Sequence, residues 1–244
     1  MNIVQIAPIF KNRVHGVKNS VTSFSSNLNK IDKINCNIYS LFIDTDFKYK
    51  GQLISPIKEI DFKSTDLIIF SGLYNIRFIW CYLMIFRYNI PYIVAPRSSL
   101  MKKSLNKSSI KKRLFLFFFG RFFLKNAKAI QFLTDEERHN SFNYNKNCFV
   151  LGNGIEHSSE IPDKKISFKK ISFIGRMDIY HKGLDRLLSA VNNCKDKLNK
   201  SGWKIHLYGP VREKDKIWIH KYIQKNDLNK FLVLGGEVDN EEKK

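Results

Sequence analysis

Two basic side chains, Arg176 and Lys182, lie between an apolar run and a helical pattern in the segment ISFIGRMDIYHKGLDRLL. The apolar run predicts a strand over 171–174, and the leucines predict a helix that begins near Gly183. A guanidinium makes forked hydrogen bonds to phosphate oxygens, an ammonium adds a mobile charge, and a helix N-terminus adds free N–H groups. Gly175 and Gly183 allow close backbone approach, so the segment predicts a diphosphate site. The alternative is that both charges are solvated in a surface loop.

These residues belong to the second of two series in which predicted strands alternate with predicted helices. Such alternation predicts parallel sheets covered by helices on both faces, with ligands at the carboxyl ends of the strands. The polar segment 156–165 predicts a linker between the two series. We therefore expect an α/β protein of two Rossmann-like, doubly wound domains, 1–160 and 161–244. The second domain is expected to be incomplete because its series stops after three strands.

The expected strands are 2–8, 36–43, 65–72, 92–95, 129–133, 147–155, 171–174, 203–209 and 231–236, and the expected helices are 17–28, 75–89, 108–127, 134–142, 184–198 and 213–225.

The composition indicates a folded protein with an anionic partner. The 244 residues are 43% hydrophobic, and the formal net charge is +20. Such an excess indicates nucleic acid, an acidic lipid surface or a phosphorylated small molecule, although AT-biased coding also enriches lysine. The sequence contains no helix-turn-helix glycine pattern, zinc spacing or RNP-like strand, so nucleic acid is the least supported partner.

Four scattered cysteines without a C-x-x-C pair favour neither zinc nor disulfides and are typical of a reducing cytosol. The apolar segment 78–86 is too short to cross a bilayer and predicts a buried helix. The N-terminal residues lack the basic start of a signal peptide. A cytoplasmic protein is therefore expected.

The segment KKRLFLFFFGRFFLK combines basic and aromatic residues on one predicted helix. Aromatic rings enter a membrane interface while cations meet anionic lipid, so this helix predicts contact with the inner face of the cell membrane. The alternative is that the phenylalanines are core and the lysines are solvated. The expected membrane contacts are Lys111, Lys112, Arg113, Phe117, Phe118 and Arg121.

The segment GRMDIYHKGLDRLL resembles the G-R-x(4-5)-K-G element of family 4 glycosyltransferases. The resemblance implies a GT-B fold and a retaining, metal-independent hexosyl transfer in which a nucleotide-sugar is a substrate and no cofactor is needed. In that family the arginine and the lysine hold the donor diphosphate and stabilise it as it leaves. By resemblance these roles fall on Arg176 and Lys182, with Gly175 and Gly183 also contacting the donor.

Two further loops fit the same family. YIVAPRSSL resembles its P-(H/R)-G-x-L loop, which places Arg97 on the acceptor side and Ser98 where glycine is usual. An arginine is not a general base near pH 7, but it can bind phosphate or orient a hydroxyl. FKNRVHGVKNSVTSF stands at the glycine-rich first loop, which implies donor contact at Gly16 and makes His15 a candidate base.

Two other similar segments have structural explanations. In AKAIQFLTDEERHN, Thr134 and Glu137 predict a capping box, in which Thr134 accepts from the backbone of Glu137 while Glu137 reaches back. In VLGNGIE, Asn153 and Gly154 predict a tight turn with left-handed backbone angles.

The resemblance also implies a hydroxyl acceptor on a lipid-linked glycan, bacterial surface polysaccharide biosynthesis and a monomeric enzyme. Members of the family continue well beyond the final strand with an E-x(7)-E element that holds donor hydroxyls. We therefore expect a chain truncated in its second domain. The alternatives are an inactive remnant that binds an anionic membrane surface and, less favoured, a basic nucleic-acid-binding protein.

Overall fold

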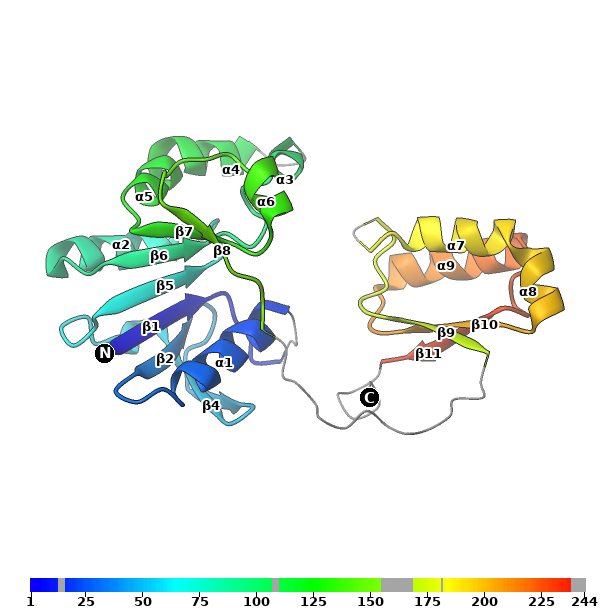
Figure 1. Ribbon diagram of the computed structural model, residues 1–244, viewed down its shortest axis with the longest axis horizontal. Coiled ribbons are helices and arrows are strands. Elements are labelled where there is room, and N and C mark those ends of the chain that lie inside the picture. Colours follow the sequence, from blue (N-terminus) through cyan, green and yellow to red (C-terminus); the bar gives the residue numbers. More distant parts are fainter. Residues whose placement is uncertain (13–15, 107–109, 155–168, 181, 238–244) are drawn as a thin grey trace. The chain divides into compact units, whose positions relative to one another are not determined.

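The computed structural model describes residues 1–12, 16–106, 110–154, 169–180 and 182–237. The chain divides into two compact units, Met1–Ser158 (unit 1) and Ser159–Lys244 (unit 2), drawn in Figure 1. The expected linker 156–165 and His15 lie outside the described residues.

Unit 1 is built on an eight-stranded sheet in the order β3-β4-β2-β1-β5-β6-β7-β8. Neighbouring strands are parallel except for β3 and β4, which form an antiparallel hairpin. The β-branched and aromatic runs of the sequence form the central strands, as expected. The strands are β1 Asn2–Ala7, β2 Asn35–Ser40, β3 Phe47–Tyr49, β4 Gln52–Pro56, β5 Leu67–Ser71, β6 Tyr92–Ala95, β7 Ala129–Phe132 and β8 Cys148–Val150.

The helices of unit 1 cover both faces of this sheet. Alternate residues of β1 face opposite sides: Ala7 packs with Val21 of the first helix, whereas Ile6 packs with Phe78 and Phe123 of later helices. The helices are α1 Gly16–Leu28, the 3-10 turn η1 Ile57–Glu59, α2 Arg77–Tyr88, α3 Lys102–Asn106, α4 Ile110–Phe115, the π-turn η2 Leu116–Gly120, α5 Arg121–Lys125 and α6 Asp135–Asn140.

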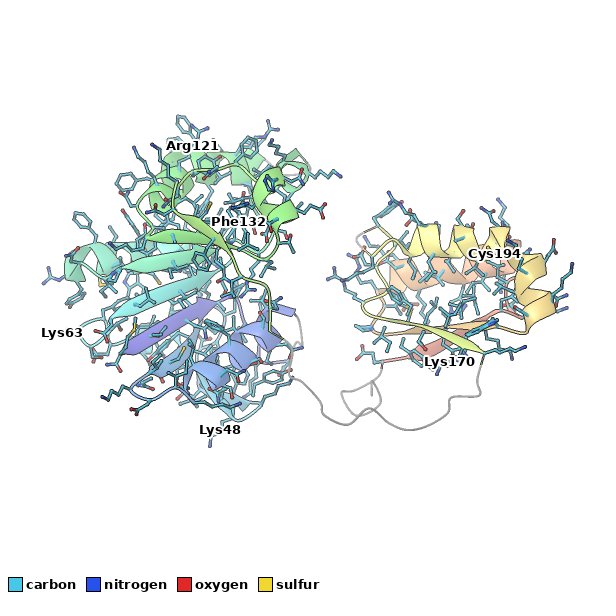
Figure 2. All side chains as sticks on the ribbon, viewed as in Figure 1. Lys48, Lys63, Arg121, Phe132, Lys170 and Cys194 are labelled. Atoms are coloured by element: carbon cyan, nitrogen blue, oxygen red, sulfur yellow. The ribbon has the colours of Figure 1, made fainter. Side chains whose placement is uncertain are left out.

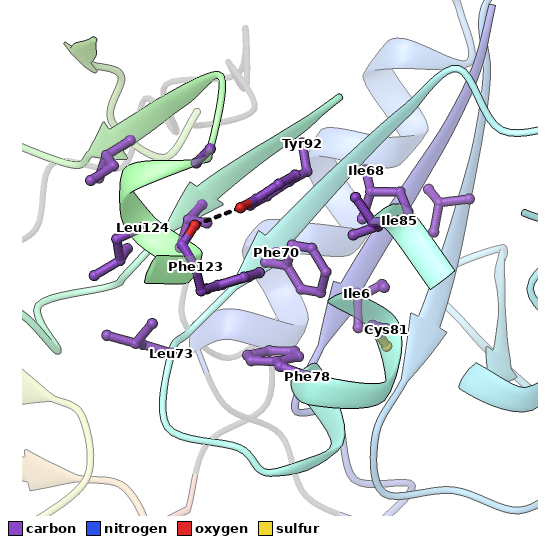
Figure 3. Close-up of a cluster of buried hydrophobic side chains, with 14 of the residues drawn as sticks. Ile6, Ile68, Phe70, Leu73, Phe78, Cys81, Ile85, Tyr92, Phe123 and Leu124 are labelled. Carbon is purple, nitrogen blue, oxygen red and sulfur yellow. Dashed lines mark hydrogen bonds between the residues drawn. The ribbon is translucent and has the colours of Figure 1, made fainter. Parts of the chain in front are cut away.

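An aromatic cluster joins the sheet to α2 and α5 (Figure 3). The ring of Phe70 meets Phe78 and Phe123 edge-on at centroid distances of 4.9 and 5.1 Å, a favoured arrangement for aromatic pairs. The hydroxyl of Tyr92 donates to the carbonyl of Phe123 over 2.6 Å. The helix α5 is therefore held against the sheet by aromatic rings of β5, β6 and α2.

Unit 2 has a three-stranded parallel sheet in the order β11-β10-β9, formed by β9 Lys170–Ile174, β10 Lys204–Tyr208 and β11 Leu232–Gly236. Its helices are α7 Leu184–Asn193, α8 Lys195–Ser201 and α9 Glu213–Lys225. Figure 1 shows α7 and α9 on the same side of the sheet. Within the described residues the expected covering of both faces is therefore wrong for this unit.

Three other expectations about elements are corrected by the structure. The helix expected over 184–198 ends at Asn193, and α8 follows after Cys194. The apolar helix α2 is buried on one side only, because Leu83 and Phe86 on its outer side are 57% and 78% exposed. Asn153 and Gly154 lack the expected positive φ. In the part of the chain that is described, every helix is too short or too polar to traverse a bilayer.

Candidate functional site

The loop that carries Arg176 is joined to the loop after the neighbouring strand. The N–H of Gly175 donates to the carbonyl of Tyr208, and the N–H of Met177 donates to that of Pro210, both over 2.9 Å. Gly209 makes this approach possible: its φ is +133°, and a Cβ there would overlap the carbonyl of Gly175. Gly209 ends the expected strand 203–209 and was not predicted as a site residue, although a glycine at the end of a strand was a usable signal.

A network of two guanidiniums and two buried carboxylates lies at this rim. The carboxylate of Asp178 is 3.5 Å from the guanidinium of Arg176 and 2.8 Å from that of Arg212. Arg212 also holds Asp215 over 2.8 Å. The side chains of both aspartates are nearly inaccessible, whereas Arg176 is 57% exposed. Arg212 is therefore fixed on two sides, and Arg176 keeps donors free for solvent or a ligand.

Lys182 lies on the same loop, because its N–H donates to the carbonyl of Asp178 over 3.2 Å. Its side chain is exposed. Gly183 follows with a φ of 66° as the residue before α7. The N–H of Leu184 is already bonded to the carbonyl of Ile179 over 3.0 Å, so the helix N-terminus offers fewer free donors than expected. The structure thus connects Arg176 and Lys182 through Asp178.

A pocket of about 370 Å³ opens beside this loop at the carboxyl ends of β10 and β11. The residue between Arg176 and Asp178, Met177, forms part of its wall. The pocket combines apolar and charged side chains, a mixture that suits a polar organic ligand. Its lining residues are Met177, Gly209, Val211, Lys216, Ile219, His220, Leu234, Gly236 and Glu237.

In unit 1, the corresponding rim residue is Arg97, two residues after the end of β6. Arg97 and Ser98 have left-handed backbones, with φ of 53° and 64°, a conformation that is strained for residues other than glycine. The guanidinium of Arg97 donates to the side-chain oxygen of Asn153 over 2.5 Å. The side chain of Asn153 therefore accepts a hydrogen bond from Arg97, and its backbone does not form the expected left-handed turn.

Arg97 reaches into a pocket of about 310 Å³ formed by the sheet, α1 and the segment after β8. Burial lowers the pKa of Arg97, and the carboxylate of Glu137 opposes that shift. Its Nε is buried and has no partner among the described residues, which leaves a donor inside unit 1 for an anion or a hydroxyl. Gln5, Ser20, Ser23, Phe24, Asn27, Ile69, Gln131, Leu151, Gly152 and Gly154 complete the lining.

Glu137 has a larger role than the expected capping box. As expected, its N–H donates to the hydroxyl of Thr134 over 3.0 Å. Its carboxylate does not reach back to Thr134, but accepts from the N–H of Leu133 over 2.7 Å and from the N–H of Ser98. Glu137 is 3% exposed. It therefore anchors the loop of Arg97 to the start of α6. Ser98 and Glu137 are 39 residues apart, so local sequence patterns do not predict this hydrogen bond.

At the first loop of unit 1, Gly16 begins α1 and has open space where a Cβ would be. Two residues later Lys18 is almost fully buried, with its ammonium 4.1 Å from the ring centroid of Tyr49 and bonded to the carbonyls of Phe10 and Lys11. Burial lowers the pKa of Lys18. This lysine fastens the segment after β1 to the hairpin, and sequence analysis did not single it out.

The expected membrane residues lie on the outer side of unit 1. Phe117 and Phe118 are 65% and 76% exposed, whereas Phe123 is fully buried, so one helix carries both core and surface rings. Figure 2 shows Arg121 pointing away from the sheet and Phe132 within the unit. Lys111, Arg113 and Arg121 are exposed and Lys112 is half-buried, beside Tyr74.

No family model matches the sequence, and no curated protein matches it. Among solved structures the chain is similar to TarM, with a TM-score of 0.68 and 12% identity over 99% of this chain and 78% of that one. It is similar to the lipopolysaccharide outer core galactosyltransferase WaaB, with a TM-score of 0.64 and 12% identity over 100% and 70%. A trehalose-6-phosphate structure from E. coli bound with UDP-2-fluoro glucose has a TM-score of 0.65 and 9% identity over 100% of this chain and 75% of that one.

These neighbours are GT-B glycosyltransferases. At such low identities the likeness shows the fold alone. The chain therefore has the α/β architecture of GT-B glycosyltransferases, which confirms the expected fold class.

Proposed function

We propose that this protein is a glycosyltransferase that moves a sugar from a nucleotide-sugar donor to a hydroxyl of an acceptor glycan. One observation carries the proposal: in a chain with this fold, Arg176 and Lys182 lie on one loop after a parallel strand. The guanidinium of Arg176 pairs with the carboxylate of Asp178, and the backbone N–H of Lys182 donates to the carbonyl of Asp178. Ligands of open α/β sheets bind at the carboxyl ends of such strands.

The chemistry at this rim is electrostatic. When the bond between the sugar and the diphosphate breaks, negative charge develops on the departing phosphate oxygens. The guanidinium of Arg176 and the ammonium of Lys182 stabilise this charge, and positioned cations of this kind supply a large share of catalysis. Gly175 and Gly183 allow the donor to approach the backbone, and the pocket beside Met177 receives the nucleoside. We assign no cofactor, because the nucleotide-sugar is a substrate.

Unit 1 supplies the acceptor side in this proposal. Arg97 lines the pocket beside α1, where its guanidinium binds a phosphate or orients an acceptor hydroxyl. Gly16, at the start of α1, leaves space for the donor phosphate. The transfer is retaining, and the protein acts as a monomer.

The acceptor is lipid-linked, and the protein binds the inner face of the cell membrane in the course of polysaccharide biosynthesis. Exposed rings at Phe117 and Phe118 beside Arg113 and Arg121 support this part. A groove of about 520 Å³ lined by Ile110, Leu114, Phe117, Arg113, Arg121 and other residues combines apolar walls with two cations. An apolar lining with cations suits an amphiphilic anion such as a lipid phosphate.

The first test is donor use by the full chain with radiolabelled UDP-, GDP- and ADP-sugars. Hydrolysis or transfer is expected with one nucleotide class, and Arg176→Ala or Lys182→Ala should lower turnover at least about tenfold. Binding of the matching nucleoside diphosphate, followed by calorimetry, should weaken in parallel.

The matched control is Arg186→Ala, an exposed arginine in the first turn of α7. Normal turnover in both the Arg176 and the Lys182 variants would remove the pair from the mechanism. A chain that binds duplex DNA with a steep salt dependence and binds no nucleotide-sugar would instead favour nucleic-acid binding.

A further inference from the structure

The outer side of α2 carries large apolar side chains that the described part of unit 1 leaves at least 40% exposed. They are Ile76, directly before α2, and Trp80, Leu83 and Phe86 on the helix itself. These residues follow one another at steps of four, three and three, and they are 74%, 40%, 57% and 78% exposed. Among them, Trp80 also meets the ring of Phe62 edge-on at a centroid distance of 5.6 Å. The buried residues of this helix lie on the other side and pack against the sheet. A contiguous apolar surface of this kind marks an interaction site. We call these four residues the α2 stripe.

The helix α2, which carries the stripe, lies beside η2 and α5. The ring of Tyr82 on α2 is 5.7 Å from that of Phe119 and 5.9 Å from that of Phe122. A groove of about 700 Å³ runs between the two helices, with Phe86 and Phe122 in its walls. The exposed ring of Phe122 therefore lies beside the α2 stripe. The exposed rings of Phe117 and Phe118 precede it on the adjoining turn η2.

The charge of this region identifies the partner. From Leu67 to Thr134 the sequence contains no aspartate or glutamate. Its twelve basic residues are Arg77, Arg87, Arg97, Lys102, Lys103, Lys107, Lys111, Lys112, Arg113, Arg121, Lys125 and Lys128. An anionic bilayer satisfies both features, because its headgroups attract cations and its interface accepts aromatic and aliphatic side chains.

We propose that α2 is the second half of the membrane-contact face of unit 1, and that the α2 stripe enters the headgroup region of an anionic bilayer together with the rings of η2 and α5. This inference rests on the membrane association in the proposed function and adds an element that the sequence indicated to be core. Trp80 is suited to this place because the indole ring prefers the boundary between headgroups and acyl chains.

Trp80 also provides a direct measurement. In a Trp203→Phe/Trp218→Phe chain, Trp80 is the only tryptophan. With vesicles of phosphatidylglycerol and phosphatidylcholine, its emission should shift to shorter wavelength and be quenched by brominated acyl chains. Vesicles of phosphatidylcholine alone should give neither effect. Unchanged Trp80 emission while the chain sediments with the anionic vesicles would overturn the proposal.

The second measurement compares three variants in vesicle sedimentation. Leu83→Gln/Phe86→Gln alters the α2 stripe, Phe117→Gln/Phe118→Gln alters the neighbouring rings, and Ile217→Gln is the control on an exposed residue of unit 2. Both double variants should partition into anionic vesicles at least about tenfold less, and the control should bind normally. Circular dichroism and nucleoside diphosphate binding check that each variant is folded.

The outcomes separate this inference from the proposed function. Loss in the Phe117/Phe118 variant with normal binding of the Leu83/Phe86 variant overturns the role of α2 and leaves membrane association standing. No vesicle binding by the unaltered chain overturns both, whereas nucleotide-sugar use remains a separate measurement. If Leu83→Gln/Phe86→Gln instead dissociates a dimer, the stripe is a contact between two copies of the chain and the proposal is wrong.

Discussion

Each unit places an arginine two residues after the end of a parallel strand, but the two units hold it in different ways. Arg97 of unit 1 lies in a strained left-handed backbone, half-buried, with its guanidinium bonded to Asn153. Arg176 of unit 2 has no positive φ, is 57% exposed and rests on Asp178 over a longer distance of 3.5 Å. Unit 1 therefore fixes its rim arginine, whereas unit 2 leaves its arginine free to move toward a ligand.

Buried carboxylates produce this difference. In unit 1 the carboxylate of Glu137 accepts from two backbone N–H groups, so it determines the path of the chain at Ser98. In unit 2 the carboxylates of Asp178 and Asp215 bond the guanidinium of Arg212. The first arrangement fixes a backbone, and the second fixes a side chain beside the rim. Stability should respond to these groups more strongly than to the rim arginines themselves.

The largest effect is expected from Arg212→Gln. This change removes the guanidinium that Asp178 and Asp215 share at 2.8 Å. Breaking a buried ion pair costs about 3–5 kcal/mol, and because Arg212 is half exposed we expect the lower end of that range for unit 2. Urea unfolding should be followed by the fluorescence of Trp203 and Trp218 in a Trp80→Phe chain.

Arg186→Gln, on the exposed side of α7, is the control and should change the unfolding free energy of unit 2 by less than about 0.5 kcal/mol. Equal unfolding curves for the two variants would mean that the carboxylates do not depend on Arg212. The contrast between the two units would then lose its basis.

A smaller effect is expected from Glu137→Gln in unit 1. The amide oxygen of glutamine replaces only one of the two carboxylate acceptors, so the N–H of Ser98 or of Leu133 loses its partner. A hydrogen bond to a charged group contributes about 1.5–3 kcal/mol, and we expect a loss near 2 kcal/mol. Trp80 fluorescence in a Trp203→Phe/Trp218→Phe chain reports unit 1. Exposed Glu136→Gln is the neighbouring control, and a loss of the same size there would contradict this account.

The elements that the sequence predicted are those with strong local patterns. The apolar runs of β1, β5 and β6 and the leucines of α7 were sufficient to predict parallel α/β units. The hairpin of β3 and β4 was missed because its strands are short and half polar. Its turn, Lys50 and Gly51 with φ of 49° and 74°, was a weak signal between them.

The site was predicted only in part, because its supports come from distant segments. Arg176 and Lys182 share one loop and could be paired by spacing. Arg212 is 34 residues from Asp178, and only the parallel register of β9 and β10 brings them together. Likewise, the outer side of α2 has the same apolar residues as a core helix, so its exposure depends on which elements cover it. Local sequence does not contain that information.

The smallest effect, and the only stabilising one, is expected from Ser98→Gly. Ser98 has a φ of 64°, which costs a residue with a Cβ roughly 1 kcal/mol and costs glycine almost nothing. Part of this gain is offset because glycine makes the unfolded chain more flexible. We expect unit 1 to gain about 0.5 kcal/mol in its unfolding free energy, measured by Trp80 fluorescence in the same background.

Ser99→Gly is the matched control for Ser98→Gly, because the adjacent Ser99 does not have a positive φ. With no strain to relieve, glycine at Ser99 should destabilise unit 1 by about 0.5–1 kcal/mol. Opposite signs at two neighbouring serines would show that unit 1 stores backbone strain at the rim beside Arg97. A loss at both positions would mean that the loop is relaxed, and that Arg97 is held no more firmly than Arg176.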